Sequence, residues 1–372
     1  MSDGHSFSRI VVKLGTSTLT AGTTRLSPPR LVDLVAQMAS LVEVGCQVVI
    51  VSSGAIAAGR ERLNYPQLPK DIPAKQMLAA VGQPRLMALY EQLFGLYGLL
   101  VAQVLLTRAD LSDRRRYLNS RNTLAALLAN GVVPVINEND TVATEEIRFG
   151  DNDNLSAQVA ALIEADLLML LTDQPGLLSA DPQRNPNARL IHEVSGPDIP
   201  EELWQAAGGS STTVGTGGML TKLRAADLAR RSGATVVIAG GGKRAVITRL
   251  AHGELLGTRF HPTASVLDSR KRYILAGKAT GTLLVDNGAV GALRNGGSLL
   301  PVGVVALEGR FERGDALLVV DQEGRHLARG LTNYGSGDVE RIRGLHSDQI
   351  EATLGYHYGD EVIHRDNLVI ME

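Results

Sequence analysis

Short apolar runs alternate with stretches of helical periodicity through the first two thirds of the chain. Runs with the length and aliphatic composition of buried strands occupy residues 10–12, 48–51, 99–106, 132–136, 167–171 and 235–239. Between them, apolar residues recur every three or four positions, which predicts helices over residues 28–44, 74–96, 114–130, 151–163 and 219–232. Ser27 before two prolines is typical of a helix start, and Gly45 of a helix stop.

Buried strands that alternate with amphipathic helices predict an α/β fold, with a mostly parallel open sheet sandwiched by helices. In such sheets, ligands bind beyond the carboxyl ends of the strands. Polar and glycine residues stand at four predicted strand ends, at residues 13–15, 52–54, 137–140 and 172–173. We therefore expect these residues to converge on one edge of the sheet.

The pattern changes after about residue 260, where helical periodicity fades. Short aliphatic segments alternate with glycine-containing turns at residues 282–285, 303–307, 316–320 and 326–329. A length of 372 residues also fits two domains better than one. We expect an α/β domain over residues 1–262, a linker over 263–279, a small, mainly β domain over 280–358 and a C-terminal tail over 359–372.

Charge and cysteine content narrow the class of protein. A net charge of −2 gives no general attraction to nucleic acid or to anionic membranes. The single cysteine, Cys46, excludes an internal disulfide framework and favours a reducing compartment. The apolar runs are far shorter than the ~20 residues of a membrane span, and no signal-peptide pattern opens the sequence. We expect a soluble, cytoplasmic protein without membrane contact.

Several familiar sites are excluded by their missing residues. The G-G-G-K sequence at residues 240–243 is followed by Arg244 rather than by Ser or Thr, so it is not a Walker A loop. No G-x-G-x-x-G follows the first predicted strand, which argues against a dinucleotide site. His5 is the only histidine before His192, so a histidine triad or metal site in the first half is excluded. The strand ends offer Gly, Lys, hydroxyl, Asp and Asn, which suit phosphate and Mg²⁺.

Five segments combine these residue types. They are V-V-K-L-G-T-S at residues 11–17, V-S-S-G-A-I-A-A-G at 51–59, N-E-N-D at 137–140 with G-D-N-D-N at 150–154, T-D at 172–173 with G-L-L-S-A-D-P at 176–182, and T-V-G-T-G-G-M-L-T-K at 213–222. The last segment places three glycines before a helix and Lys222 about one turn inside it, as in a phosphate-binding loop.

Each segment also has a plainer interpretation. Lys13 could be a strand-end lysine that reaches solvent, and Ser52 or Ser53 could be a helix N-cap. Asp151 or Asp153 could cap the next helix, although four Asp and Asn residues in a row exceed what a cap needs. The segment at residues 213–222 could be a linker, but a linker has no use for a lysine one turn into the following helix.

In this order, the five segments resemble the amino acid kinase superfamily, and within it the glutamate kinases of proline biosynthesis. V-S-S-G-A-I-A-A-G, I-N-E-N-D and G-D-N-D-N-L-S-A are specific in combination, and the C-terminal region resembles a PUA domain, so the resemblance spans nearly the whole chain. One departure is Leu178, where the family usually has the aromatic residue of G-L-Y. The departure concerns details of the nucleotide pocket.

The resemblance implies that ATP phosphorylates the side-chain carboxylate of L-glutamate to give L-glutamyl 5-phosphate, with Mg²⁺ accompanying ATP. It also implies a homo-oligomer (a tetramer or dimer), feedback inhibition by L-proline, and at most a weak, non-essential RNA contact through the PUA-like domain. By position, the catalytic matches are Lys13, Lys222 and Asp153, and the substrate-binding matches are Ser53, Asp140 and Asn152. The nucleotide-binding matches are Lys13, Thr172, Asp173, Thr216, Gly217, Gly218, Met219, Leu220, Thr221 and Lys222, and metal ligands are unassigned.

Two alternatives stay open. A kinase of the same superfamily that acts on aspartate, N-acetylglutamate, carbamate or UMP would share the Lys and Gly segments but not the Asp and Asn cluster in this form. An RNA-binding or RNA-modifying protein is suggested by the PUA-like region, but residues 268–372 hold 12 Lys and Arg against 15 Asp and Glu, unlike a strong RNA binder. A carboxylate acceptor has a pKa of ~4.3 and is already ionised at neutral pH, so its reaction needs no general base. This fits the lack of histidine between His5 and His192.

Overall fold

The computed structural model describes residues 7–69, 71–143, 152–182, 185–208, 218–265, 271, 274–275 and 278–371. The chain divides into two compact units, the first formed by Met1–Ser112 with Asn119–Val266 and the second by Asp113–Leu118 with Leu267–Glu372. Each unit has a sheet and a hydrophobic core of its own.

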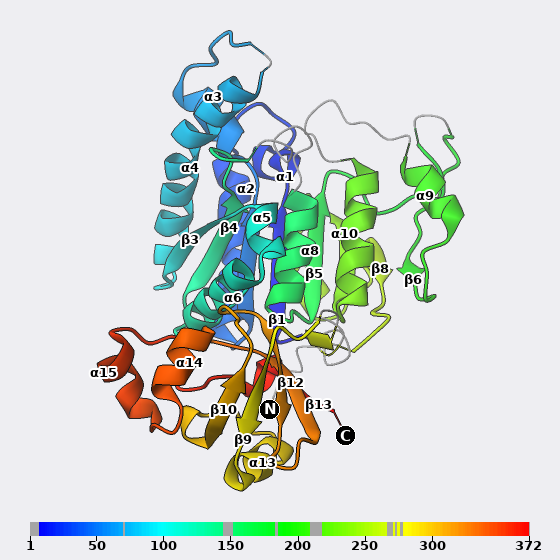
Figure 1. Ribbon diagram of the computed structural model, residues 1–372. Helices are drawn as coiled ribbons and strands as arrows, with labels where there is room; N and C mark the ends of the chain where they lie inside the picture. Colours follow the sequence, from blue (N-terminus) through cyan, green and yellow to red (C-terminus); the bar gives the residue numbers. More distant parts are fainter. Residues whose placement is uncertain are drawn as a thin grey trace. The chain divides into compact units, whose positions relative to one another are not determined.

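The first unit is built on an eight-stranded sheet (Figure 1). Its strands lie in the order β3 (Val101–Leu106), β4 (Val133–Glu138), β2 (Gln47–Ser52), β1 (Arg9–Leu14), β5 (Leu167–Thr172), β7 (Thr235–Gly240), β8 (Thr258–Phe260) and β6 (Glu193–Val194). Neighbouring strands are parallel except for β7 and β8, which pair antiparallel. The carboxyl ends of β1, β2, β4 and β5 therefore meet at one edge of the sheet.

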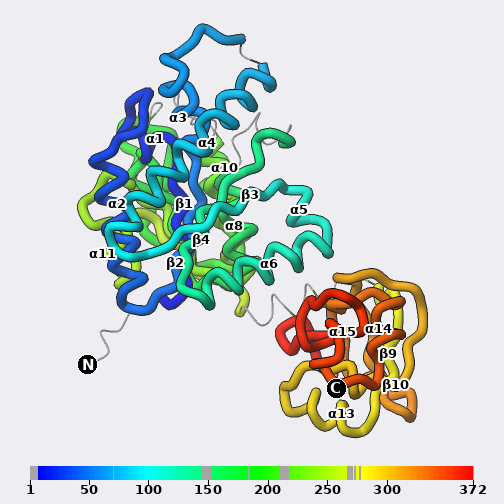
Figure 2. Tube along the Cα trace, turned by 90° about the vertical axis from the view of Figure 1, so that its left-hand side faces the viewer, coloured from blue at the N-terminus to red at the C-terminus, as the bar shows by residue number. Residues whose placement is uncertain are grey.

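Helices cover both faces of this sheet (Figures 1 and 2). One face carries α2 (Pro28–Glu43) and α11 (Val246–Ala251), and the other carries α8 (Asn152–Leu162) and α10 (Met219–Arg231). The other helices before residue 266 are α1 (Thr16–Thr20), α3 (Ala55–Arg62), α4 (Ile72–Gly95), α5 (Arg108–Ser112), α6 (Arg114–Ala129) and α9 (Glu201–Ala207). Because both faces are covered, the central strands are apolar along their whole length rather than at alternate positions.

Strand β1 illustrates this rule and its one exception. Ile10, Val11, Val12 and Leu14 are completely buried and apolar. Lys13 lies among them and is only 5% exposed. A buried lysine needs a partner of opposite charge, because removing an ammonium group from water is costly. A buried lysine among the buried apolar residues of β1 therefore marks the carboxyl-end edge of the sheet as a candidate functional site.

The second unit contains a five-stranded sheet with short helices. Its strands lie in the order β10 (Val304–Glu308), β9 (Gly281–Val285), β11 (Ala316–Val320), β12 (His326–Leu331) and β13 (Leu368–Ile370). Its helices are α13 (Asn287–Arg294), α14 (Ser336–Ile342) and α15 (Ile350–Leu354), with 3₁₀ turns at Pro301–Gly303, Ser347–Gln349 and Arg365–Asn367. Apolar residues of the sheet and helices, among them Leu283, Leu317 and Ile342, form its core.

The predicted α/β class, with a mostly parallel sheet and a smaller β-rich C-terminal region, is confirmed. Strand β4 extends through Asn137 and Glu138, which the sequence pattern placed after the strand. Helices α13 and α14 were not expected, because with eight and seven residues they are too short for the apolar spacing to repeat. Among the described residues, no helix is both long enough and apolar enough to cross a membrane.

Candidate active site

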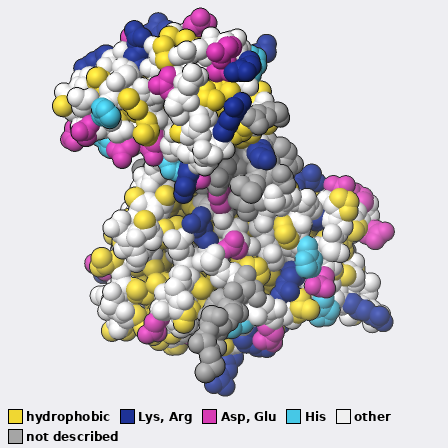
Figure 3. All heavy atoms as spheres, turned by 90° about the horizontal axis from the view of Figure 1, so that it is seen from below, with side chains coloured by type: hydrophobic (Ala, Val, Ile, Leu, Met, Phe, Trp, Pro, Cys, Tyr) yellow, Lys and Arg dark blue, Asp and Glu magenta, His cyan; other side chains and the backbone are white. Residues whose placement is uncertain are grey.

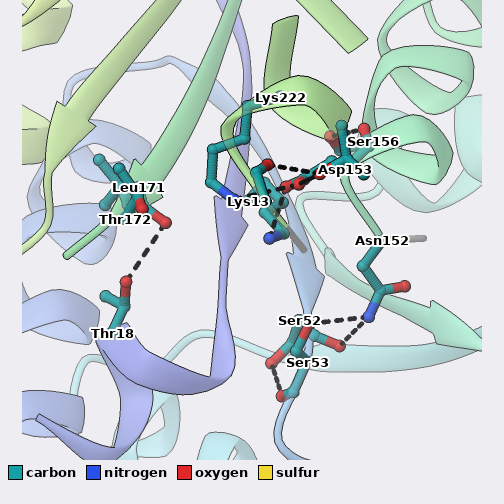
Figure 4. A network of polar contacts seen from close by, with 12 residues as sticks. Lys13, Thr18, Ser52, Ser53, Asn152, Asp153, Ser156, Leu171, Thr172 and Lys222 are labelled. Carbon is teal, nitrogen blue, oxygen red and sulfur yellow. Dashed lines mark hydrogen bonds and ion pairs between the residues drawn. The ribbon is translucent and has the colours of Figure 1, made fainter. Parts of the chain in front are cut away.

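Two lysines from distant parts of the chain share one buried carboxylate at the strand-end edge (Figure 4). Lys13 of β1 lies with its Nζ 2.6 Å from Asp153 Oδ1, and Lys222 of α10 with its Nζ 3.1 Å from Asp153 Oδ2. Thr221 donates its hydroxyl hydrogen to Asp153 Oδ2 at 2.7 Å. Asp153, in the first turn of α8, therefore binds both lysines.

The charges explain why this carboxylate stays ionised. Asp153 is completely buried, and burial alone would raise the pKa of its carboxyl. The ammonium groups of Lys13 and Lys222 outweigh that effect and hold this pKa far below its usual range. One negative charge between two positive ones leaves a net positive charge, which suits the binding of anionic groups.

The N-terminus of α10 adds polar groups beside the lysines. The N-cap of this helix is Gly218, which has no side chain to cap it. Within the described part of the chain, the first main-chain N–H groups of α10 are therefore suited to bind an anion. Met219, Leu220, Thr221 and Lys222 form its first turn. Thr216 and Gly217, which belong to the same predicted nucleotide loop, lie outside the described residues.

A second cluster surrounds Ser53, at the end of β2. Asn152 donates from Nδ2 to Ser53 Oγ at 2.9 Å (Figure 4). The same amide group donates to Asn137 Oδ1 at 3.0 Å. Residue 54 requires glycine, because its φ of 104° lies in the left-handed region and a Cβ there would meet Leu19 at 3.0 Å. This turn allows Ser53 to leave the strand just before α3 begins.

The helix-cap interpretation is wrong for Ser52, Ser53 and Asp153, which the structure describes. Gly54, not a serine, is the N-cap of α3, and no side chain caps that helix. The Ser52 hydroxyl instead contacts the hydroxyl of Tyr90 at 2.8 Å and donates to the main-chain oxygen of Ser53. Asp153 binds lysines rather than capping α8. Asp151, the other residue considered as a cap, is outside the described residues.

Asp140 follows β4 and is partly buried. Burial raises the pKa of its carboxyl to about 6. A partly desolvated carboxylate gains by accepting a cation, because the cation restores the favourable interactions that water supplied. Asp140 is therefore suited to bind a ligand's ammonium group.

Thr172 and Asp173 stand at the end of β5. The Thr172 hydroxyl donates to Asp173 Oδ1 at 3.0 Å, and Thr18 of α1 donates to the main-chain oxygen of the neighbouring Leu171 at 3.2 Å. Leu178, the departure noted in the sequence, forms an isolated β-bridge with Leu190. The bridge pairs these two residues in antiparallel orientation beyond the strand end.

A cavity of about 770 Å³ joins both clusters. Its lining includes Lys13, Ser53, Asp140, Asn152, Thr172, Asp173 and Lys222. Asp153, Gly218, Met219, Leu220 and Thr221 do not line it, and Asp153 lies buried beneath the lysines. The described residues contain no group of three or more His, Cys, Asp or Glu side chains placed to hold a metal ion. The cavity thus has a positively charged part at Lys13 and Lys222 and an acidic wall at Glu138 and Asp140.

Sequence patterns missed several residues of this site. Helices α3 and α4 contribute Arg60, Lys75 and Leu78 to the cavity wall. Gln83 of α4 binds Asn137 behind the wall through a 2.9 Å hydrogen bond. The signal for Gln83 was a polar residue at a buried position of an otherwise apolar helix face. No local signal marks Arg60 or Lys75, since charged helix residues are ordinarily solvated.

Comparison with known proteins finds families and relatives that match this chain over nearly its whole length. The sequence profile of the amino acid kinase family matches residues 8–240, and that of the PUA domain matches residues 281–354. The glutamate 5-kinase of Shewanella amazonensis is 57% identical over all of this chain and 98% of its own length. The glutamate 5-kinase of Photobacterium profundum is 57% identical over 97% of this chain and 96% of its own length. That of Aliivibrio salmonicida is 55% identical over 97% and 98%.

The fold, the lysine pair and the full-length similarity agree. Family profiles and relatives cover both the sheet that carries the cavity and the C-terminal sheet. The chain belongs to the amino acid kinase family, and within it to the glutamate 5-kinases.

Proposed function

We propose that this protein transfers the γ-phosphoryl group of ATP to the side-chain carboxylate of L-glutamate, giving L-glutamyl 5-phosphate and ADP in the first step of proline biosynthesis. The observation that carries the proposal is the pair of buried lysines, Lys13 and Lys222, held on one carboxylate at the wall of the cavity. Both substrates are anions at the atoms that react, so the site must bring negative charges together.

The chemistry requires charge stabilisation rather than a base. The acceptor carboxylate, with a pKa of ~4.3, is ionised at neutral pH and attacks the γ-phosphorus directly. Negative charge spreads over the transferred phosphoryl oxygens, and preorganised cations lower the energy of that arrangement. Asp153 holds Lys13 and Lys222 in place before the substrates arrive, so no reorganisation is needed during transfer.

The acidic wall of the cavity would bind the amino acid. Asp140 would accept the α-ammonium group, while Ser53 and Asn152 would position the molecule through hydrogen bonds. Polar groups set at fixed points in a cavity discriminate by leaving a wrong substrate with unpaired groups. We propose that this wall, rather than the lysines, selects glutamate over other carboxylates.

ATP would lie against the ends of β5 and α10. Thr172 and Asp173 would contact the nucleotide, and the segment from Thr216 to Lys222 would bind its phosphates. A kinase of this family uses ATP with a divalent metal, which we propose is Mg²⁺. Mg²⁺ usually keeps several waters and binds one or two carboxylates with the phosphates of its nucleotide. Asp173 lines the cavity at the end of β5, so its carboxylate would hold such an ion together with the phosphates, and the ion would supply further positive charge.

We also propose a homo-oligomer, a dimer or tetramer, with feedback inhibition by L-proline and a cytoplasmic location. The single, buried Cys46 supports a reducing compartment. A strong RNA role for the PUA domain is disfavoured by its charge. On the face drawn in Figure 3, basic and acidic side chains are interspersed rather than gathered in a basic patch. We propose at most a weak, non-essential RNA contact.

The test is hydroxylamine trapping of the acyl phosphate. Purified protein with ATP and Mg²⁺ should form hydroxamate from L-glutamate and much less from L-aspartate or N-acetyl-L-glutamate. Addition of L-proline should reduce the yield. Hydroxamate from aspartate but not from glutamate would assign the site to a different substrate, and ADP release without hydroxamate would exclude acyl-phosphate formation.

A further inference from the structure

A network of side-chain amides lies behind the part of the cavity wall that contains Ser53 and Asn152. Gln83 of α4 donates from Nε2 to Gln103 Oε1 of β3 at 3.2 Å. Asn137 of β4 donates from Nδ2 to Gln83 Oε1 at 2.9 Å. Asn152 of α8 donates from Nδ2 to Asn137 Oδ1 at 3.0 Å and to Ser53 Oγ at 2.9 Å. This network of hydrogen bonds thus links β3, the edge strand of the sheet, to the Ser53 hydroxyl.

The direction of these hydrogen bonds is set by one main-chain group. The N–H of Glu138 donates to Asn137 Oδ1 at 2.9 Å. A main-chain N–H donates and never accepts, so the Asn137 atom facing it must be the oxygen. The amide nitrogen of Asn137 then faces Gln83, and that of Asn152 must face Asn137. The orientation of each amide follows from the one before it.

The consequence appears at Ser53. The amide nitrogen of Asn152 lies 3.0 Å from Asn137 Oδ1, 2.9 Å from Ser53 Oγ and 3.5 Å from the main-chain oxygen of Ser52. Its two hydrogens serve the two shorter contacts, so the Ser53 hydroxyl accepts one of them. In the described part of the chain, Ser53 Oγ makes no other side-chain hydrogen bond. Its own hydrogen is then available to the cavity that Ser53 lines, and a hydroxyl that donates there suits a carboxylate.

We propose that Gln83 is a positioning residue: it holds in place the amides that leave Ser53 as a hydrogen-bond donor toward the carboxylate of the bound amino acid. Gln83 does not line the cavity and is only 9% exposed, so it acts through Asn137 and Asn152. Its Oε1 accepts the Asn137 amide hydrogen that would otherwise be buried without a partner. Without that acceptor, the Glu138 N–H still sets the direction of the Asn137 amide, but the amide loses the partner that holds it in place. Asn137 and Asn152 can then shift, and the hydrogen bond from Asn152 that keeps the Ser53 hydrogen directed at the cavity is lost.

The proposal rests on glutamate being the substrate and is tested by a double-mutant cycle in the full-length protein. Gln83→Met keeps the size of the side chain but removes the acceptor, and it should raise the glutamate KM about tenfold while the ATP KM changes less than about twofold. Gln83→Glu keeps an acceptor for Asn137, and the exposed Gln103 can turn its amide to match, so the glutamate KM should stay within about threefold of wild type.

The decisive measurement is the same change in a Ser53→Ala background. If Gln83 acts through Ser53, Gln83→Met should then alter the glutamate KM by less than about twofold, because the hydroxyl that it positions is gone. An equal tenfold rise in both backgrounds, or an equal rise in the ATP KM, would show a merely structural role and overturn the inference. If Gln83→Met does not fold, Gln83→Glu decides alone, since a tenfold rise there overturns it. Wild-type protein that forms no glutamyl hydroxamate would instead refute the proposed function.

Discussion

At the scale of single residues, one fully buried carboxylate organises the site. Asp153 is paired with two lysines that lie 209 positions apart in the sequence (222 minus 13). Each of the three charges would be costly to bury alone, but together they satisfy one another. One carboxylate holds both Lys13 and Lys222 in place, and the three groups together keep a net positive charge. The lysines therefore act on the reacting groups, and Asp153 acts through the lysines.

Replacement of Lys222 tests this division of roles. Lys222→Ala should lower kcat by about a hundredfold to a thousandfold and raise the glutamate KM less than about threefold, because its charge matters most as negative charge spreads in the transition state. Steady-state rates of hydroxamate formation check the split. Lys278→Ala, at an exposed lysine, is the matched control and should leave both constants unchanged. An unchanged kcat in Lys222→Ala would contradict the assigned role.

The raised pKa of Asp140 predicts a pH dependence of substrate binding. Burial raises that pKa to about 6, so the carboxylate loses its charge as pH falls through this value. The glutamate KM should therefore rise on going from pH 8 to pH 5, approaching roughly tenfold per pH unit below the pKa. Initial rates at varied glutamate concentration give the profile.

Asp140→Asn is the control for this pH profile. Its glutamate KM should be high and nearly independent of pH, since no charge remains to titrate. A folded-state pKa above the usual value also means that Asp140 stabilises the fold while protonated and loses this contribution as pH rises through about 6. The Asn variant should thus melt at a higher temperature than wild type at pH 8. If the glutamate KM of Asp140→Asn depended on pH as steeply as that of wild type, Asp140 would be excluded as the cause of the pH dependence.

At the scale of elements, the substrate wall depends on two helices whose backbones touch. A Cβ at Gly82 of α4 would lie 1.8 Å from the main-chain oxygen of Ala55, the first residue of α3. A Cβ at Gly59 of α3 would lie 1.9 Å from the main-chain oxygen of Leu78. Only glycine permits such contact. Because α3 begins directly after Gly54, this crossing fixes the position of Ser53.

A methyl group at residue 82 should separate the two helices. Gly82→Ala is expected to destabilise the fold by about 1–3 kcal/mol, the usual cost of overpacking, and to raise the glutamate KM by at least about threefold. Gly95→Ala is the matched control in the same helix, because nothing lies within 4 Å of its Cβ. It should be neutral or stabilise by up to about 1 kcal/mol. Denaturant melts and glutamate titrations check both, and equal effects of the two substitutions would contradict the explanation.

At the scale of the whole molecule, the described chemistry belongs to the first unit. All residues that line the cavity fall between Lys13 and Lys222. The second unit has its own sheet and its own core, with Leu283, Leu317 and Ile342 among its buried residues. We propose that the α/β domain spans residues 1–262, with a linker at 263–279, the PUA domain at 280–358 and a tail at 359–372.

A shortened chain tests this proposed boundary. Protein that ends at residue 265 should keep at least about half of the glutamyl hydroxamate activity of the full chain, because it retains every cavity-lining residue. Circular dichroism establishes whether the shortened chain folds. A folded but inactive product would show that the C-terminal unit takes part in catalysis.

The sequence by itself determined the class of fold and the chemistry of the site. Buried apolar runs and helical periodicity are local properties, so strands such as β1 and helices such as α2 could be read directly from the pattern. Parallel strands place their carboxyl ends together, which predicted that Lys13, Ser53 and Asp140 would meet. The lack of histidine between His5 and His192 fitted an acceptor that is already ionised.

Only the tertiary structure decided which residues pair and in which direction. In the residue pattern, Asp153 was one of several Asp and Asn residues, and only the family resemblance assigned it to the two lysines. Its contacts with Lys13 and Lys222 depend on three elements that are packed together. Gln83 stood out only as a polar residue on an otherwise apolar helix face, and its partner Asn137 became known from the structure. Pairing energies depend on distance and burial between residues far apart in the chain, and a linear pattern contains neither.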